Sequence, residues 1–264
     1  MPRPQSRSDH WGYERSLRPC LAPPSAPRRR GITTRQAPAL ITSAANPRLR
    51  LVRRLASRSQ REREGLFVVE GEDLVDAARS AGIEPVDLLV AGENVEPELL
   101  AEVSSLPHPA RAIGIYRRAD LPRGTRDLAL ALWHVHDPGN VGTLLRTADG
   151  FGASVALTPG SGDITSPKAL RASMGSVFRV PTAPFEDAGR PRVALVSRGG
   201  TPLPELELGE RVTFVLGAER EALPDEVLRD CDAQATIPQA EHTDSLNVAA
   251  AGAIALYEAA RRGK

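Results

Sequence analysis

The sequence has 264 residues, of which 41% are hydrophobic and 25% charged, ordinary values for a globular protein of one large or two modest domains. This composition excludes a wholly disordered chain, a collagen, a coiled coil and a disulfide-rich scaffold. No stretch approaches the ~18 apolar residues of a membrane helix, and the Arg- and Pro-rich N-terminus shows no apolar segment of a secretory signal. We therefore expect no membrane partner. The two cysteines, Cys20 and Cys231, are far apart in the sequence, so we expect a reducing, cytoplasmic setting.

Charge is distributed unevenly along the chain. Residues 1–61 contain 14 Arg and two acidic residues, for a net charge of +12, whereas residues 62–264 carry −11. This segregation predicts a basic arm that faces a polyanion. The alternative is a composition bias without function, because arginine replaces lysine throughout most of the chain.

The predicted elements begin after residues 1–38, a Pro- and Arg-rich segment without apolar periodicity that we expect to be disordered. A basic helix punctuated by Leu49, Val52 and Leu55 follows. Together with the elements after it, this helix forms a small α/β domain over residues 39–120, and residues 121–127 are expected to be a linker. The further elements predicted in this domain are strands at 66–69, 86–90 and 112–116 and helices at 73–80 and 99–103.

The remaining residues, 128–264, alternate between strand and helix. Strands separated by helices predict a mostly parallel sheet covered on both faces. The predicted strands are 128–133, 154–157, 193–196, 212–216 and 233–237. One helix is predicted to start at Asn140, and three more are predicted at 166–173, 224–230 and 245–262.

The most informative segment runs from Asp137 to Gly152. Its apolar residues recur at i, i+3, i+4 and i+7 from Val141, which predicts one buried helix face with Asn140 as the N-cap. Arg146 lies about 140° around the helix from Val141, outside that face. A helix that opens directly after a strand occurs where α/β sheets bind ligands, so Arg146 is a candidate site residue; the alternative is a surface arginine. The glycine spacing matches neither dinucleotide nor phosphate-loop motifs.

Two further segments place polar residues beside predicted strand ends. Gly217 and Glu219 follow the 212–216 strand, where glycine permits close approach of the backbone to a ligand; an ordinary turn is the alternative. Ser245 is predicted to cap the last helix, with Asn247 in its first turn, and a solvated helix start is the alternative. His134 and His136 alternate on a predicted strand, but no Cys or carboxylate cluster completes a metal site, so we expect no metal.

Taken together and in order, these segments resemble the SpoU (TrmH-like) RNA ribose methyltransferases of the SPOUT superfamily. The resemblance covers roughly residues 40–262, and the start of the N-terminal domain is similar to the family's substrate-binding domain, which resembles ribosomal proteins. Two turns depart from the family pattern, one at Ala222 and the other at Gln239 and Glu241. The matching positions are Asn140, Gly142 and Arg146 for N-x-G-x-x-x-R, Gly217 and Glu219 for G-x-E, and Ile237, Pro238, Ser245, Leu246, Asn247 and Val248 for I-P followed by S-L-N-V.

The resemblance implies a C-terminal domain with a deep trefoil knot, a homodimer with the site at the subunit interface, and S-adenosyl-L-methionine as cofactor. Because a guanidinium stays protonated in proteins, stabilisation of a developing alkoxide is the safer role for Arg146 than that of a base. The residues that the resemblance implies are catalytic are Arg146, Asn140, Glu219, Ser245 and Asn247, and those that hold the cofactor are Gly217, Ile237 and Leu246.

The expected function is methylation of a ribose 2′-hydroxyl, with 23S rRNA as the preferred substrate. Transfer RNA is the alternative substrate, and the competing functions are a catalytically inactive RNA-binding relative and a nicotinamide-dependent dehydrogenase. Aromatic residues make up 4% of the chain, too few for a base-stacking platform, so we expect RNA to be bound through its shape and backbone. The residues expected to contact RNA phosphates are Arg48, Arg50, Arg53, Arg54 and Arg58.

Overall fold

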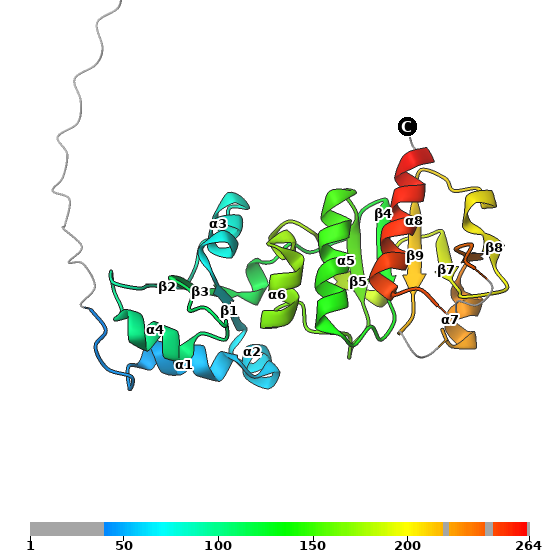
Figure 1. Cartoon of the computed structure of the whole chain (residues 1–264). Coiled ribbons are helices and arrows are strands. Elements are labelled where there is room, and N and C mark those ends of the chain that lie inside the picture. The colour runs from blue at the N-terminus through cyan, green and yellow to red at the C-terminus, as the bar shows by residue number, and fades with distance from the viewer. Residues whose placement is uncertain (1–39, 219–221, 241–244, 263–264) are drawn as a thin grey trace, which may run out of the picture. The chain divides into compact units, whose positions relative to one another are not determined.

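The computed structural model describes residues 40–218, 222–240 and 245–262, which form two sheets flanked by helices (Figure 1). The segment predicted to be disordered, residues 1–38, lies outside the described residues. No helix within the described ranges is both long and apolar enough to span a membrane.

A three-stranded antiparallel sheet organises the N-terminal part of the described chain. Its elements in chain order are α1 (Pro47–Leu55), α2 (Arg58–Glu64), β1 (Leu66–Glu70), α3 (Glu72–Ser80), β2 (Asp87–Val90), α4 (Pro97–Val103) and β3 (Ala112–Arg117), followed by the short 3-10 helix η1 (Arg118–Asp120). The strand order is β1-β3-β2, so β3 pairs with both neighbours. The predicted strands and helices of this domain are therefore confirmed, with ends that differ by one or two residues.

The basic helix expected here is in fact two helices. Helix α1 begins after Asn46, whose side chain accepts a hydrogen bond from the Arg48 backbone N–H at 2.9 Å. Leu49, Val52 and Leu55 bury its apolar face in the core of this sheet. Helix α1 ends at Leu55, and α2 begins at Arg58 after the two intervening residues.

The second sheet has seven strands in the order β6-β5-β4-β9-β7-β10-β8, and every strand pair in it is parallel. The predicted parallel α/β fold is thus confirmed, although the two short edge strands, β6 and β8, were not predicted. The elements are β4 (Leu128–Leu132), α5 (Pro138–Gly150), β5 (Ser154–Leu157), α6 (Pro167–Ser173), η2 (Ser176–Phe178), β6 (Thr182–Pro184), η3 (Phe185–Asp187), β7 (Arg192–Leu195), β8 (Thr201–Pro202), η4 (Leu203–Glu205), β9 (Val212–Leu216), α7 (Asp225–Asp230), β10 (Ala233–Thr236) and α8 (Val248–Arg262).

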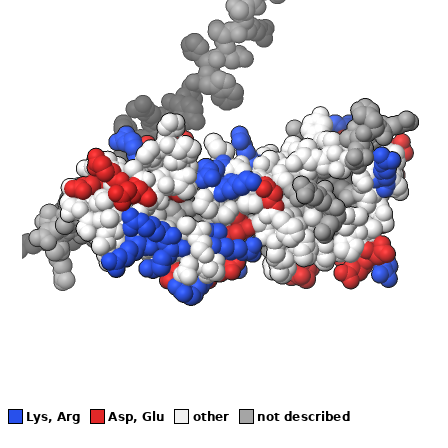
Figure 2. Space-filling view, turned by 60° about the horizontal axis from the view of Figure 1, so that its bottom comes forward, with Lys and Arg blue, Asp and Glu red and all other residues white. Residues whose placement is uncertain are grey.

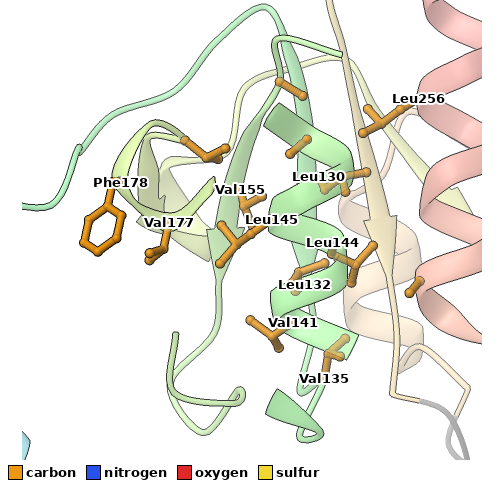
Figure 3. Close-up of a cluster of buried hydrophobic side chains, with 14 of the residues drawn as sticks. Leu130, Leu132, Val135, Val141, Leu144, Leu145, Val155, Val177, Phe178 and Leu256 are labelled. Atoms are coloured by element: carbon orange, nitrogen blue, oxygen red, sulfur yellow. The ribbon is translucent and has the colours of Figure 1, made fainter. Parts of the chain in front are cut away.

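Both faces of this sheet are covered, because alternate residues of β4 face opposite sides. Leu130 and Leu132 pack with α5 and α8 on one face, whereas Ala131 packs with Val227 of α7 on the other. Helix α5 lies between α6 and α8 (Figure 1), and Figure 3 shows its apolar side chains directed toward those of β4 and β5.

Two glycines allow the helices on this face to approach closely. A β-carbon on Gly142 of α5 would overlap the carbonyl oxygen of Ala169 and lie 2.7 Å from the β-carbon of Ala172, both on α6. On the other side, a β-carbon on Gly252 of α8 would overlap a methyl group of Leu144. Helix α5 is therefore held tightly between its two neighbours.

Several predicted ends of this part are shifted by one or more residues, and three of these differences concern candidate site residues. Helix α5 is capped by Asp137, which accepts a hydrogen bond from the Asn140 backbone at 2.9 Å, so Asn140 lies in the first turn and is not the cap. Helix α8 begins at Val248 and not at Ser245, because the side chain of Asn247 caps it. Strand β4 ends at Leu132, so the two histidines follow the strand and do not alternate on it.

The two sheets share one buried core. The rings of Phe67 and Tyr116, from the first sheet, lie 6.4 Å and 5.7 Å from the ring of Phe178, which follows α6. Nearby, the guanidinium of Arg61 on α2 donates to the Asp163 carboxylate at 2.8 Å and 2.9 Å, and both side chains are 4% exposed. The N-terminal part is thereby anchored on the loop that follows β5.

Candidate active site

A pocket of about 490 Å³ lies where β7, β9 and β10 end at their carboxyl termini. Parallel α/β sheets bind ligands at this edge. The pocket wall includes all three residues expected to hold the cofactor, Gly217, Ile237 and Leu246, together with the expected catalytic residue Ser245. The sequence-based assignment thus converges on one cavity from three separate segments of the chain.

Asn140 and Asn247 are in direct contact although 107 positions separate them. The side-chain nitrogen of Asn247 donates to Oδ1 of Asn140 at 3.3 Å. The Asn247 side-chain oxygen accepts from the backbone N–H groups of Ala249 at 2.9 Å and Ala250 at 3.3 Å. The amide is therefore oriented by the helix it caps, and it brings Asn140 beside the chain segment 245–246 that lines the pocket.

The start of α5 is fixed by charge as well as by its cap. Asp137 pairs with Lys168 at the beginning of α6. The hydrogen bond from Lys168 holds the pKa of the Asp137 carboxyl below its usual value, so the cap remains ionised. An anionic group at a helix N-terminus is also favoured by the helix dipole.

Arg146 does not line the pocket of its own chain. It lies six residues after Asn140, which corresponds to about 9 Å along the helix and about 120° around it. Its side chain is exposed, as the periodicity predicts. On the neighbouring helix α8, Ile254 and Tyr257 are also exposed, by 39% and 57%. Helix α8 therefore exposes two large apolar side chains beside α5, which carries Arg146.

The other expected site residues are distributed as follows. Glu219 lies outside the described residues, as does Glu241, one of the two departures at the third motif. Ala222 and Gln239, which mark the other departures, both line the pocket. The side-chain oxygen Oε1 of Gln239 is buried and has no hydrogen-bond partner among the described residues. An unpaired acceptor in a pocket wall is costly unless a ligand or water satisfies it.

Sequence reasoning missed the contribution of β7 to the pocket. Val196, Ser197 and Arg198, which follow this strand, line the cavity. The strand itself was predicted, but its place in the sheet between β9 and β10 follows only from the strand order. No local signal in the sequence distinguishes these residues from an ordinary turn.

The arginines expected to contact RNA differ in how much of their charge is available. Figure 2 shows Lys and Arg side chains gathered over the part that contains α1 and α2. Arg48, however, forms a two-pronged ion pair with Asp87 and donates to the Leu88 carbonyl. The side chain of Arg50 has no hydrogen bond or ion pair with another described residue. The other three have exposed partners: Arg53 pairs with Glu102, Arg54 with Glu64 and Arg58 with Glu62.

Among the described residues, no three His, Cys, Asp or Glu side chains gather in a way that could hold a metal ion. Cys231 is half-buried, and burial raises the pKa of its thiol, which disfavours a reactive thiolate.

Comparison with known families identifies both parts of the chain. Residues 127–257 match the SpoU rRNA Methylase family, and residues 46–117 match the MRM3-like substrate binding domain. An "Uncharacterized tRNA/rRNA methyltransferase" from Synechocystis is 32% identical over 85% of this chain and 94% of its own length. The chain belongs to the SpoU rRNA methylase family. The resemblance deduced from the three motifs is thus confirmed, and the dehydrogenase alternative is wrong.

Other members of the SpoU family align over nearly their full length. The 23S rRNA (guanosine(2553)-2′-O)-methyltransferase RlmP of Bacillus subtilis is 28% identical over 82% of this chain and 97% of its own. The crystal structure of an AdoMet-bound rRNA methyltransferase from Sinorhizobium meliloti is 30% identical, with a TM-score of 0.75 over 84% of this chain and 97% of that chain. The match therefore extends over both sheets.

Proposed function

We propose that this SpoU-family protein transfers a methyl group from S-adenosyl-L-methionine to a ribose 2′-hydroxyl of RNA. The observation that supports it most directly is the contact between Asn247 and Asn140, which links the first and third motifs beside a pocket lined by Gly217, Ile237 and Leu246. Polar groups converging at the edge of a largely apolar cavity are typical of a small-molecule site.

The pocket suits a molecule with an apolar ring system and a polar tail. Its volume lies within the range of ligand pockets, roughly 300–1,000 Å³. Leu195, Leu216 and Ile237 provide apolar surface for an adenine ring, and the unpaired Oε1 of Gln239 offers an acceptor. When bound, S-adenosyl-L-methionine supplies a methyl group made electrophilic by its sulfonium. Gly217, Ile237 and Leu246 are proposed to hold it, largely through their backbones.

The protein's own side chains have to orient the hydroxyl and ease the loss of its proton. We assign orientation to Asn140, Glu219, Ser245 and Asn247. Arg146 stays protonated and therefore stabilises the developing alkoxide by its charge.

Because α5 directs Arg146 away from its own Asn140, we propose that the active form is a homodimer. A second copy that covers the exposed face of α5 and α8 buries Ile254 and Tyr257 and presents its Arg146 to the pocket of the first. The trefoil knot implied by the resemblance stays a prediction, since parts of the loops before α8, residues 219–221 and 241–244, lie outside the described residues.

The proposed substrate is 23S rRNA in the cytoplasm. Support comes from the RlmP relative, whose name specifies a guanosine of 23S rRNA, and from the match to a substrate-binding domain. In this proposal residues 39–120 bind RNA, residues 121–127 link the domains, and residues 128–264 carry the methyltransferase. Transfer RNA remains the second candidate, because the Synechocystis relative is named for both RNA classes.

The test is methyl transfer from tritiated S-adenosyl-L-methionine to unmodified 23S rRNA and to unmodified tRNA, followed by nuclease digestion to locate the label. We expect label in a 2′-O-methylated nucleotide of 23S rRNA. Label in tRNA alone would select the second candidate. Failure to bind S-adenosyl-L-homocysteine in calorimetry, together with no transfer, would reject the methyltransferase proposal.

A further inference from the structure

Three ring side chains cluster directly after β4, in the short segment that leads into α5. The rings of Trp133 and His134 lie 5.0 Å apart, and those of His134 and His136 lie 5.7 Å apart in an edge-to-face arrangement. Trp133 packs edge-on against Phe185 at 5.2 Å, whereas His134 is half-buried and His136 is exposed. The cluster therefore has an inner end in the protein and an outer end in solvent.

The backbone that presents these rings is strained. His134 has φ 51°, the left-handed region that a residue with a side chain rarely adopts. Its neighbours enforce this conformation: Trp133 N–H donates to the Leu216 carbonyl at 2.8 Å, and His134 N–H donates to Thr158 Oγ1 at 2.9 Å. Glycine would adopt the same conformation without strain, so the structure retains an imidazole here at a cost. Strain of this kind concentrates at functional sites.

The outer ring is also held in a defined orientation. His136 Nδ1 lies 3.0 Å from the carbonyl oxygen of Gly160. A carbonyl oxygen only accepts hydrogen bonds, so Nδ1 carries the proton in this contact. The contact fixes the orientation of an exposed ring, whose flat face is open to stacking.

A continuous series of contacts places the cluster between the N-terminal part and the pocket. On one side, Arg58 of α2 donates to the Ser161 carbonyl at 3.2 Å, next to the Gly160 carbonyl that orients His136. On the other side, the backbone N–H of Trp133 donates a hydrogen bond to the carbonyl of Leu216, which lines the pocket together with Gly217. The rings therefore belong to the chain segments that connect α2 with the pocket.

We propose that His134 and His136 form a nucleobase-binding site, on which a base of single-stranded RNA stacks beside the nucleotide to be methylated. This inference rests on the proposed function and adds to it a specificity-determining contact. Unpaired RNA bases commonly stack on aromatic side chains, including histidine. The low aromatic content of the whole chain argued against base stacking, but the fold brings the rings of Trp133, His134 and His136 together in one short segment.

The test uses the full-length protein carrying Trp11→Phe, so that Trp133 is the only tryptophan and its fluorescence reports on the cluster. Two probes are titrated: a twelve-nucleotide adenosine RNA, and a ribose-phosphate chain of equal length without bases. We expect the adenosine RNA to quench Trp133 and to bind about 5- to 100-fold more tightly, because stacking contributes about 1–3 kcal/mol per base.

His134→Gly removes the ring and relieves the strain, so its melting temperature should not fall. In His134→Gly and in His136→Ala, the ratio of the affinities for the two probes should fall at least fivefold. Each variant should also raise the KM for RNA while leaving kcat nearly unchanged. Two matched controls are expected to keep the preference. His108→Ala changes an exposed histidine elsewhere, and Met174→Gly changes the second non-glycine residue that has a left-handed backbone among the described residues.

The inference would be overturned if the wild-type protein bound the two probes equally or bound neither. It would also be overturned if His134→Gly and His136→Ala kept the wild-type preference. Calorimetry with S-adenosyl-L-homocysteine separates this outcome from failure of the proposed function. A protein that binds this molecule and methylates RNA, but shows no dependence on the histidines, refutes the base site alone. Loss of cofactor binding and transfer in the wild type refutes the methyltransferase.

Discussion

The side-chain amide of Asn247 makes two kinds of contact at once, capping α8 through its oxygen and donating through its nitrogen to Asn140 at 3.3 Å. The two functions depend on different atoms of one group. The helix cap needs only the oxygen, whereas the link to α5 needs the NH₂. This division makes it possible to remove the link and keep the helix.

Asn247→Asp should therefore leave the protein folded and reduce methyl transfer about 10- to 100-fold. Aspartate caps helices as well as asparagine does, but it cannot donate to Asn140 when ionised. Melting temperature and tritium incorporation are the two measurements. Asn247→Ala serves as the comparison, because it should in addition lose about 1 kcal/mol of stability from the cap. Full activity in Asn247→Asp would contradict a role for the link.

Arg146→Ala should lower methyl transfer by about 10²–10³-fold, the usual cost of losing a group that stabilises developing negative charge. Cofactor binding should be unaffected, since Arg146 does not line the pocket of its own chain. Transfer is measured with tritiated S-adenosyl-L-methionine and binding by calorimetry with S-adenosyl-L-homocysteine. An active variant, or one that no longer binds the cofactor product, would show that Arg146 has been assigned incorrectly.

Mixing two inactive variants tests whether Arg146 acts on a second copy. Arg146→Ala and Asn140→Ala, unfolded and refolded together, give dimers of which half contain one chain of each kind. Each mixed dimer has one intact site if Arg146 acts across the interface, so activity should return to about a quarter of the wild-type value. If Arg146 acts within its own chain, no mixed dimer has an intact site and the mixture stays inactive.

The affinity for RNA should fall steeply with salt, because the proposed contacts are to phosphates. Arg50→Ala should reduce the slope of log K against log salt by about 0.7–1, the value for one lost phosphate contact. Arg48→Ala is the matched variant: its guanidinium already pairs with Asp87, so we expect a lower melting temperature and an unchanged slope. Filter binding at four salt concentrations gives the slopes, and a flat dependence in the wild type would reject phosphate binding by this segment.

Asp163→Asn should destabilise the protein by about 3–5 kcal/mol, since it leaves Arg61 buried with an uncompensated charge. Burial by itself raises the pKa of Asp163, but hydrogen bonds from Thr165 and Arg61 and the charge of Arg118 outweigh it and hold the pKa below the usual value. The stability contributed by this carboxylate is therefore complete above about pH 4 and is lost as the pH falls further.

Urea unfolding of the wild type and Asp163→Asn at several pH values measures this difference, which should be constant near neutrality and shrink below pH 4. Asp120→Asn is the control, because Asp120 lies in an exposed pair with Arg117 at 4.0 Å and should change stability by less than about 1 kcal/mol. A difference that grows in acid would contradict the assignment.

The sequence predicted what depends on local pattern. The spacing of Val141, Leu144, Leu145 and Ala148 identified α5 and its buried face correctly. Its cap was placed three residues too late, because Asp137 and Asn140 are both good capping residues. Pro138 marks the true start, since proline is favoured in the first turn, and this signal was available.

Long-range partners could not be predicted in the same way. Nothing near Arg48 in the sequence shows that it faces Asp87, which lies 39 positions away. The same holds for Arg61 and Asp163, and for the strand order that brings the end of β7 into the pocket. Counting arginines therefore overestimated the charge available to RNA. The family motifs succeeded because they already encode which distant segments meet.

The close packing of Gly142 against α6 fixes the rotational position of the helix that carries the first motif. Within seven residues, Asn140 contacts Asn247, Gly142 packs against α6 and Arg146 is exposed. Since each residue turns the helix by about 100°, inserting or deleting one residue in this turn would misdirect all three together. Substitution at one of these positions would therefore damage one contact, whereas a shift in register would displace Asn140, Gly142 and Arg146 at the same time.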